Sequence, residues 1–195
     1  MHHFLRDAPL VSCHVSASSL NAALAATHPA LALYLRAETP DDLDFSASLY
    51  ATTRQAEMNA LPWSDAEKSA FCRMQFNAQH LHYVGHYPAV QFLVIERNSV
   101  RIGRVYIEQK AAALLLMEIT LAPEQRGAGV GGAIAVALLQ QARANALPMH
   151  LHVEPLNPAK RLYERLGFRD IETEGFYTFM VCDPRPEADQ LNTNS

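Results

Sequence analysis

The sequence predicts a single domain of the α/β class, and three observations support this prediction. The chain has 195 residues, which is enough for one ordinary domain. Segments with strand-like alternation are interspersed with segments in which apolar residues recur at helical spacing. One strand-like segment runs into the stretch EQRGAGVGG (124–132), and a helical segment follows it. Strand, glycine turn and helix in this order are typical of α/β proteins that bind a phosphate group.

Local signals indicate where several elements begin or end. Ser64 followed by Glu67 forms a capping box at a helix start. Asn98-Ser99 favours a tight turn between two strands, and Gly167 is typical of a helix end. The expected strands are 31–36, 89–97, 100–110, 113–121, 149–155 and a closing hairpin over 168–182, and the expected helices are 38–58, 62–84, 133–144 and 158–168.

The domain is predicted to occupy the middle of the chain. Residues 20–35 are apolar, but polar residues and Pro29 interrupt them, so they do not predict a membrane-spanning helix. We expect residues 1–28 to be a weakly structured N-terminal extension that is at most partly helical. The domain itself is expected over residues 29–182, and residues 183–195 are expected to be a flexible tail.

Charge and cysteine content exclude some classes of partner. The net charge is −4 and no run of Lys or Arg occurs, so the sequence does not predict a nucleic-acid surface. Cys13, Cys72 and Cys182 are far apart, which argues against a disulfide framework and against a zinc knuckle. We therefore expect a cytoplasmic protein with no membrane, nucleic-acid or metal partner.

The glycines fit two motifs, of which the first is a dinucleotide-binding motif. Gly127, Gly129 and Gly132 match GxGxxG, and Glu154 lies about 20 residues further on, where such folds place a ribose-binding acid. However, APEQR (122–126) separates the strand from the first glycine. Only about one further βα unit fits before the tail, so this interpretation is disfavoured.

The second motif is R/Q-x-x-G-x-G/A, matched by Arg126, Gly129 and Gly131 after a strand. Together with LAPEQRGAGVGGAI (121–134) and LHVEPLNPAKRLYERLGF (151–168), it makes the sequence similar to the GNAT superfamily of acetyl-CoA-dependent N-acetyltransferases. The resemblance extends over residues 30–182 in element order and is strongest over 114–168. PWSDAEKSAFCRMQFNAQHLHY (62–83) also resembles a group of bacterial GNAT proteins without an assigned substrate.

The resemblance implies a fold and a donor. The fold is a mixed, mostly antiparallel twisted sheet of about six to seven strands with helices on both faces. The strand before the glycine loop splays from the next parallel strand, and the pantetheine arm of acetyl-CoA fills the gap. Backbone groups near Ile119 and Leu121 would pair with this arm, and one N–H would polarise the thioester carbonyl.

The glycine loop is the expected diphosphate site. A helix N-terminus offers free N–H groups and a dipole that favours an anion, and glycine lets the backbone approach closely. The residues expected to bind the cofactor here are Arg126, Gly127, Ala128, Gly129, Val130, Gly131 and Gly132, and the resemblance adds Asn157. Arg126 would add charge at the rim. The alternative is that the small residues serve only to pack the helix on the sheet.

Two residues are candidates for proton transfer. An amine must lose a proton before it attacks the thioester, and the thiolate that leaves must gain one. Glu118 is the one carboxylate in LLLMEITL (114–121), and its alternative role is that of a solvent-facing strand residue. Tyr163 lies where the family places its general acid, and its alternative role is that of an aromatic residue packed on the sheet.

The acceptor is an amine of open identity. The resemblance implies transfer to a small or amino-acid-like amine, or to a protein N-terminus or lysine, by a monomer or a homodimer. The alternative is a non-catalytic acyl-CoA-binding sensor. By analogy with the family, Trp63, His80, Tyr83 and Tyr87 would shape the acceptor cleft. His82 and His86 have the spacing of metal ligands on a helix, but no third ligand is evident.

Overall fold

The computed structural model describes residues 14–184 as one α/β unit. Residues 1–13 and 185–195 lie outside the described part of the chain, so the expected tail over 183–195 falls almost entirely outside it. Within residues 14–184, no helix combines the length and the apolar character that crossing a membrane requires.

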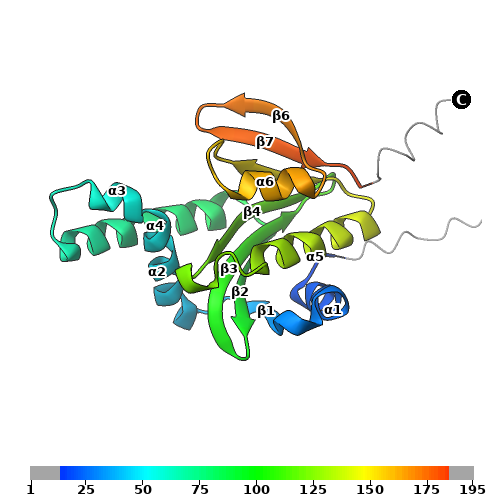
Figure 1. The fold of residues 1–195 in the computed structure, drawn as a ribbon, viewed down its shortest axis with the longest axis horizontal. Coiled ribbons are helices and arrows are strands. Elements are labelled where there is room, and N and C mark those ends of the chain that lie inside the picture. The colour runs from blue at the N-terminus through cyan, green and yellow to red at the C-terminus, as the bar shows by residue number, and fades with distance from the viewer. Residues whose placement is uncertain (1–13, 185–195) are drawn as a thin grey trace, which may run out of the picture.

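A seven-stranded sheet forms the centre of the molecule, in the order β1-β2-β3-β4-β5-β7-β6 (Figure 1). The strands are β1 (Leu33–Ala37), β2 (Val90–Arg97), β3 (Val100–Gln109), β4 (Leu114–Leu121), β5 (Met149–Val153), β6 (Arg169–Glu174) and β7 (Tyr177–Cys182). Only the β4–β5 pair is parallel, and every other neighbouring pair is antiparallel. The predicted mixed, mostly antiparallel sheet is therefore confirmed.

Helices cover both faces of this sheet. They are α1 (Ala17–Thr27), α2 (Leu43–Thr53), α3 (Gln55–Asn59), α4 (Asp65–His86), α5 (Val130–Ala144) and α6 (Ala159–Arg165), with short 3₁₀ turns η1 (Pro29–Leu31), η2 (Pro40–Asp42) and η3 (Pro123–Gln125). Helices α1 and α5 share the larger apolar cluster, and α2, α3 and α4 form a smaller one. Figure 1 shows α1 beside α5, with α2, α3 and α4 grouped on the other side of the sheet.

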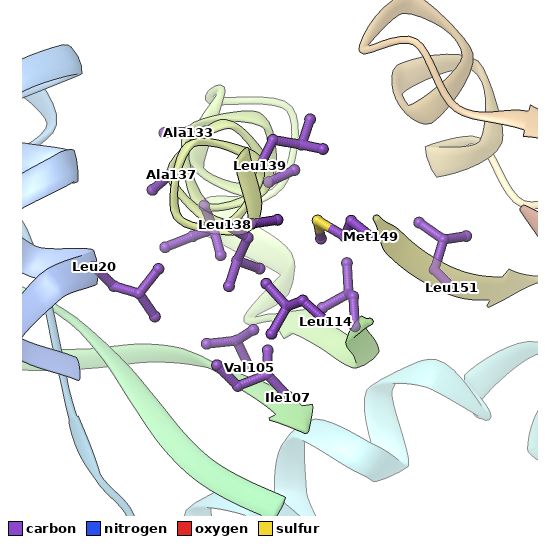
Figure 2. Packing of buried hydrophobic residues seen from close by; sticks show 14 of the residues in the cluster. Leu20, Val105, Ile107, Leu114, Ala133, Ala137, Leu138, Leu139, Met149 and Leu151 are labelled. Carbon is purple, nitrogen blue, oxygen red and sulfur yellow. The ribbon is translucent and has the colours of Figure 1, made fainter. Parts of the chain in front are cut away.

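The larger cluster joins α5 to the sheet strands that carry the site. Figure 2 shows Ala133, Ala137, Leu138 and Leu139 of α5 above apolar side chains of β3, β4 and β5. The labelled strand side chains of this cluster are Val105, Ile107, Leu114, Met149 and Leu151. Ala133 and Ala137 lie on the side of α5 nearer Leu20 of α1. Packing of α5 against both α1 and the sheet fixes the position of the glycine loop at its N-terminus.

The N-terminal segment differs from the extension expected over residues 1–28. Residues 17–27 form α1, and Ser16 and Ser19 cap it reciprocally, with the Ser19 N–H donating to Ser16 Oγ at 3.2 Å. Leu20 and Leu24 are fully buried in the larger cluster. The segment is therefore part of the core, because these leucines, one helical turn apart, meet α5 and β1.

The local signals set the ends of elements as predicted. Ser64 Oγ accepts the Glu67 N–H, and the Glu67 carboxylate accepts the Ser64 N–H at 2.8 Å, so the capping box at α4 is confirmed. Asn98 and Ser99 have φ values of 50° and 62°, which is the geometry of a tight β-hairpin turn. Gly167 follows α6 with φ of 94°, a conformation that glycine adopts without strain.

Strands β4 and β5 separate soon after they meet. Their pairing covers only Leu114–Leu116 against Met149–Leu151, although β4 continues to Leu121. Opposite β3, Tyr106 pairs with Glu118 and Ile107 with Leu116, so Met117 has no partner residue. Such a β-bulge bends a strand and increases its twist. It lies at the point where β4 leaves β5, and the predicted splay is confirmed.

Candidate active site

A cavity of about 500 Å³ lies where β4 and β5 separate. The backbone and side chains of β4 from Leu115 to Thr120 form one wall, and Leu151 to Glu154 contribute another. Tyr163 of α6 lies on the β5 side, while α2 and α4 contribute residues from the opposite face. The cavity thus brings together Glu118, Ile119, Asn157 and Tyr163, which the sequence suggested separately.

The backbone of β4 offers unpaired hydrogen-bonding groups to this cavity. The Ala122 N–H donates to the Ile102 carbonyl of the β3 side at 2.9 Å. Because N–H and C=O groups alternate between the two sides of a strand, those of Ile119 and Leu121 point away from β3, toward the gap. The Leu121 carbonyl accepts the Arg126 Nε–H at 3.0 Å. The Ile119 N–H and C=O and the Leu121 N–H are therefore the groups that face the gap.

Glu118 is held in place by one of its two carboxylate oxygens. Oε1 accepts from Arg104 Nε at 3.0 Å, from Arg104 Nη2 at 2.6 Å and from the Thr120 hydroxyl. Oε2 is buried and has no partner. Glu118 is thus an ion-paired, mostly buried residue, which removes its alternative role as a solvent-facing strand residue.

Arg104 lies beneath Glu118 and was missed in the sequence. Its side chain is 0% exposed, its Nη1 donates to the Ser46 carbonyl at 2.9 Å, and it lies over the rings of Phe76 and Tyr106. Burial acts to lower the pKa of Arg104, but Glu118 above all, together with Tyr106 and Glu38, more than offsets this, and the net effect raises the pKa, so the guanidinium stays charged.

Replacing Arg104 by methionine is expected to lower the free energy of unfolding by about 3–5 kcal/mol, because a buried pair loses one member and leaves the other charge uncompensated. Urea unfolding at neutral pH measures this change. The double variant Arg104→Met/Glu118→Met should recover most of the loss, since no buried charge then remains. A single-variant loss below about 1 kcal/mol would show that the pair contributes little to stability.

Tyr163 has an apolar, water-poor setting on the other side of the cavity. The residue is 9% exposed, and its ring packs edge-on against Phe168 with the ring centroids 5.6 Å apart. Burial raises the pKa of the Tyr163 phenol to about 12. The residue is therefore both a packed aromatic and a phenol that lines the cavity and keeps its proton at neutral pH.

The glycine loop stands exposed at the start of α5. Gly127 and Gly129 have φ values of 73° and 79°, and Gly129 is the N-cap of the helix. A Cβ at either position would meet nothing within 4 Å, so glycine is required there by the backbone conformation. At Gly131 a Cβ would make only an ordinary contact, with Leu121 Cδ1 at 4.0 Å. At Gly129 the left-handed conformation is a reason for glycine in addition to the expected one, room for close approach.

Arg126 fastens the loop to its surroundings. Besides the Leu121 carbonyl, its guanidinium donates to the Thr52 hydroxyl of α2, with Nη2 and Oγ1 2.6 Å apart. These contacts orient the side chain across the end of β4 toward α2. The guanidinium that was expected to add charge at the rim of the diphosphate site therefore already makes hydrogen bonds within the protein. Because Arg126 is exposed, its remaining N–H groups can still donate to a bound group.

Asn157 starts α6. Its Oδ1 accepts the Ala159 N–H at 2.9 Å, and the residue also lines the cavity. This hydrogen bond gives Asn157 a structural role in orienting the helix that carries Tyr163.

The residues expected to shape the acceptor cleft divide into two groups. Tyr83 and Tyr87 of α4 line the cavity. Burial, and then the nearby Glu118 carboxylate, raise the pKa of Tyr83 to about 12. Trp63 instead packs against Phe71 with the ring centroids 5.4 Å apart, and His80 packs against Phe92 at 4.7 Å. Of these four residues, only the two tyrosines line the cavity, and their role toward an acceptor stays a prediction.

Several cavity residues carried no signal in the sequence. The cavity is lined from α2 by Tyr50 and from the C-terminal end of α2 by Arg54. Helix α4 contributes Gln79, and β7 contributes Tyr177. They come from segments that are distant in sequence, and no motif links them. His82 and His86 stack with their ring centroids 4.2 Å apart, and no cluster of three or more metal-ligand side chains occurs within residues 14–184.

Among the described strands, the sheet splays at its parallel β4–β5 pair, beside a glycine loop that opens α5, which is the arrangement of a GNAT-like α/β fold. Residues 88–170 match the family model of the acetyltransferase (GNAT) domain. This match confirms, over residues 88–170, the resemblance to the GNAT superfamily that the sequence indicated, and the fold agrees with it.

Solved structures of this fold include proteins with bound coenzyme A. The PaiA N-acetyltransferase from Thermoplasma acidophilum, in complex with coenzyme A, is 18% identical with a TM-score of 0.60, covering 77% of this chain and 98% of its own. The spermidine N-acetyltransferase from Vibrio cholerae, in complex with CoA and spermine, is 24% identical with a TM-score of 0.57, covering 78% and 96%. An acetyltransferase from Thermus thermophilus is 17% identical with a TM-score of 0.58, covering 78% and 97%. At these identities the likeness is one of fold. No curated protein sequence matches the chain.

Proposed function

We propose that this protein transfers the acetyl group of acetyl-CoA to a primary amine by direct attack within a ternary complex. The observation that carries the proposal is the single cavity at the splay of β4 and β5. It is lined by a carboxylate with a free oxygen, Glu118, by a protonated phenol, Tyr163, and by the open edge of β4. These are the groups that acyl transfer from a thioester to an amine requires.

The residues present fit acetyl-CoA as the donor. Free N–H groups at the start of α5 suit a diphosphate, and the left-handed glycines at 127 and 129 keep side chains out of its way. The gap between β4 and β5 suits an extended arm, whose amides would pair with the free groups of Ile119 and Leu121. Acetyl-CoA would supply the acetyl group as an activated thioester.

Proton transfer would begin at Glu118. An amine is mostly protonated at neutral pH and must lose a proton before it attacks. Arg104 and Thr120 hold Oε1, and this leaves Oε2 as the acceptor, either directly or through water. An N–H group of Ile119 or Leu121 would polarise the thioester carbonyl, and Tyr163 would return a proton to the departing sulfur.

Replacing Glu118 by glutamine is expected to lower kcat by about 10²-fold and leave the affinity for CoA unchanged. The amide keeps a carbonyl oxygen for Arg104 and Thr120 but cannot accept the amine proton. The rate should therefore lose its acidic limb in a pH–rate profile. The matched control is Glu154→Gln, an exposed carboxylate of the same cavity, which should retain the profile. Near-normal kcat in Glu118→Gln would assign proton removal to water alone.

The proposed activity itself is tested by thiol release from acetyl-CoA over a panel of amines. We expect release of CoA with at least one small amine or amino-acid-like acceptor, together with calorimetric binding of CoA in the micromolar range. Binding of CoA without release for any amine would contradict transfer and favour a non-catalytic acyl-CoA-binding module.

A further inference from the structure

The cavity carries a cation whose charge the acetyl transfer does not use. We infer that the acceptor amine also bears a carboxylate, that Arg54 binds this carboxylate, and that the acceptors are free amino acids. This inference rests on the proposed acetyl transfer and adds the class of its second substrate.

Arg54 is placed and available for an anion. It is the C-cap residue between α2 and α3, and its side chain lines the cavity and is 33% exposed. Its guanidinium lies over the Tyr50 ring, with Cζ 5.4 Å from the ring centroid, and this contact limits its orientation. A stacked guanidinium in a fixed orientation is well suited to hold a carboxylate with two parallel hydrogen bonds.

The present partner of Arg54 is a weak one. Nη1 donates to Glu57 Oε1 at 3.0 Å, and the Glu57 side chain is 60% exposed. Exposed ion pairs of this spacing contribute little free energy. Among the residues that the structure describes, no other carboxylate forms an ion pair with Arg54, so a substrate carboxylate can bind its remaining donors.

The same cavity contains buried acceptors that lack a donor. Oε2 of Glu118 and Oε1 of Gln79 are both buried without a hydrogen-bond partner, and both residues line the cavity. A buried acceptor without a donor is costly, and an amine or ammonium group supplies the missing N–H. The cavity therefore offers acceptors for an amine and a cation for a carboxylate, which is the complement of an amino acid.

A polyamine fits this charge pattern poorly. Its several cations call for several free carboxylates, but the lining contains only Glu118 and Glu154. Glu118 is already paired with the fully buried Arg104 at 2.6 Å, and Arg54 would repel a second ammonium group. The remaining lining includes Tyr50, Tyr83, Tyr87 and Tyr177, whose uncharged rings suit the carbon skeleton of an amino acid.

The test compares acceptors that differ only in the carboxylate. Thiol release from acetyl-CoA is measured with phenylalanine, methionine and lysine, each beside its amide and its decarboxylated amine, and with spermidine. For at least one series we expect kcat/KM of the free acid to exceed that of the amide and of the amine by about 10- to 100-fold, since a charge-assisted bidentate contact is lost without the carboxylate.

Variants of Arg54 assign this preference to the guanidinium. Arg54→Met should raise the KM of the acid until the preference disappears, while the KM of acetyl-CoA stays unchanged. Arg54→Lys should keep part of the preference. The matched control is Arg73→Met, because Arg73 pairs with Asp44 at 2.8 Å and lies outside the cavity lining. It should behave as the wild type.

Several results would overturn the inference. Equal kcat/KM for acid, amide and amine in every series would show that no carboxylate is recognised. A preference for spermidine would show that the acceptor is a polyamine and not an amino acid. A raised KM for acetyl-CoA in Arg54→Met would assign Arg54 to the donor. If Arg54→Met does not fold, the inference is tested by the kcat/KM ratios of acid, amide and amine in the wild type and in Arg54→Lys. No thiol release with any acceptor would instead remove the proposed transfer itself.

Discussion

Replacing Tyr163 by phenylalanine is expected to lower kcat by about 10- to 10³-fold, with little change in the KM for acetyl-CoA. The variant keeps the ring and its packing on Phe168 and removes only the hydroxyl group. Backbone N–H groups can stabilise charge on the carbonyl oxygen, but they cannot return a proton to the sulfur. The loss should therefore fall on the chemical step and not on binding.

The elevated pKa of Tyr163 gives this prediction a pH dependence. Burial raises the pKa to about 12, so the phenol remains protonated through the neutral and mildly alkaline range. Since ionisation would remove the proton that it donates, Tyr163 should cause no loss of rate below roughly pH 11. Any alkaline limb at lower pH should then be shared by the wild type and Tyr163→Phe.

Two measurements separate chemistry from packing at this position. Thermal unfolding of Tyr163→Phe should match the wild type closely, and Tyr34→Phe, an exposed residue of β1, should keep full activity. If Tyr163→Phe turns over as fast as the wild type while Tyr163→Ala loses stability, the residue is a packing aromatic and water protonates the sulfur.

Replacing Gly129 by glutamate is expected to abolish CoA binding. The change places a negative charge at the N-terminus of α5, where the proposal puts the diphosphate, and it forces a side chain into the left-handed conformation at φ of 79°. Calorimetry with CoA measures the loss directly. Dephosphorylated pantetheine should bind the wild type much more weakly than CoA, because it lacks the diphosphate.

Matched variants separate charge from backbone strain. Gly129→Asn tolerates the left-handed conformation and should keep most of the affinity, whereas Gly129→Ala reports the strain alone, on the order of 1–2 kcal/mol. Gly175→Glu makes the same change at another left-handed glycine, in the β6–β7 turn, and should not affect CoA binding. Unaltered affinity in Gly129→Glu would remove the loop from the donor site.

The parts of the site that were predictable are those encoded in a contiguous stretch. The strand, glycine loop and helix over 114–144 follow one another in the sequence, so their order reveals the loop. The same holds for Tyr163, which follows β5 on a helix closed by Gly167. Local backbone preferences and hydrogen bonds decide these elements.

The parts that were missed depend on register and on distant packing. Arg104 meets Glu118 because β3 and β4 pair antiparallel with a bulge at Met117, and the sequence does not give that register. Arg54 and Gln79 reach the cavity from separate helices. Helix α1 was underestimated because its apolar face becomes evident only when α5 lies beside it.

The short pairing of β4 with β5 has a mechanical consequence. It divides the sheet into two plates, β1–β4 and β5-β7-β6, joined along a seam of three residue pairs from Leu114–Met149 to Leu116–Leu151. Glu118 is carried by the first plate, and Tyr163 lies on the helix between β5 and β6 of the second. The separation of the two groups is therefore set by the angle at the seam. Substitutions in these three residue pairs are expected to change the angle between the two parts of the sheet. They should therefore change the orientation of Glu118 relative to Tyr163, while the contacts that each residue makes with its own neighbours stay the same.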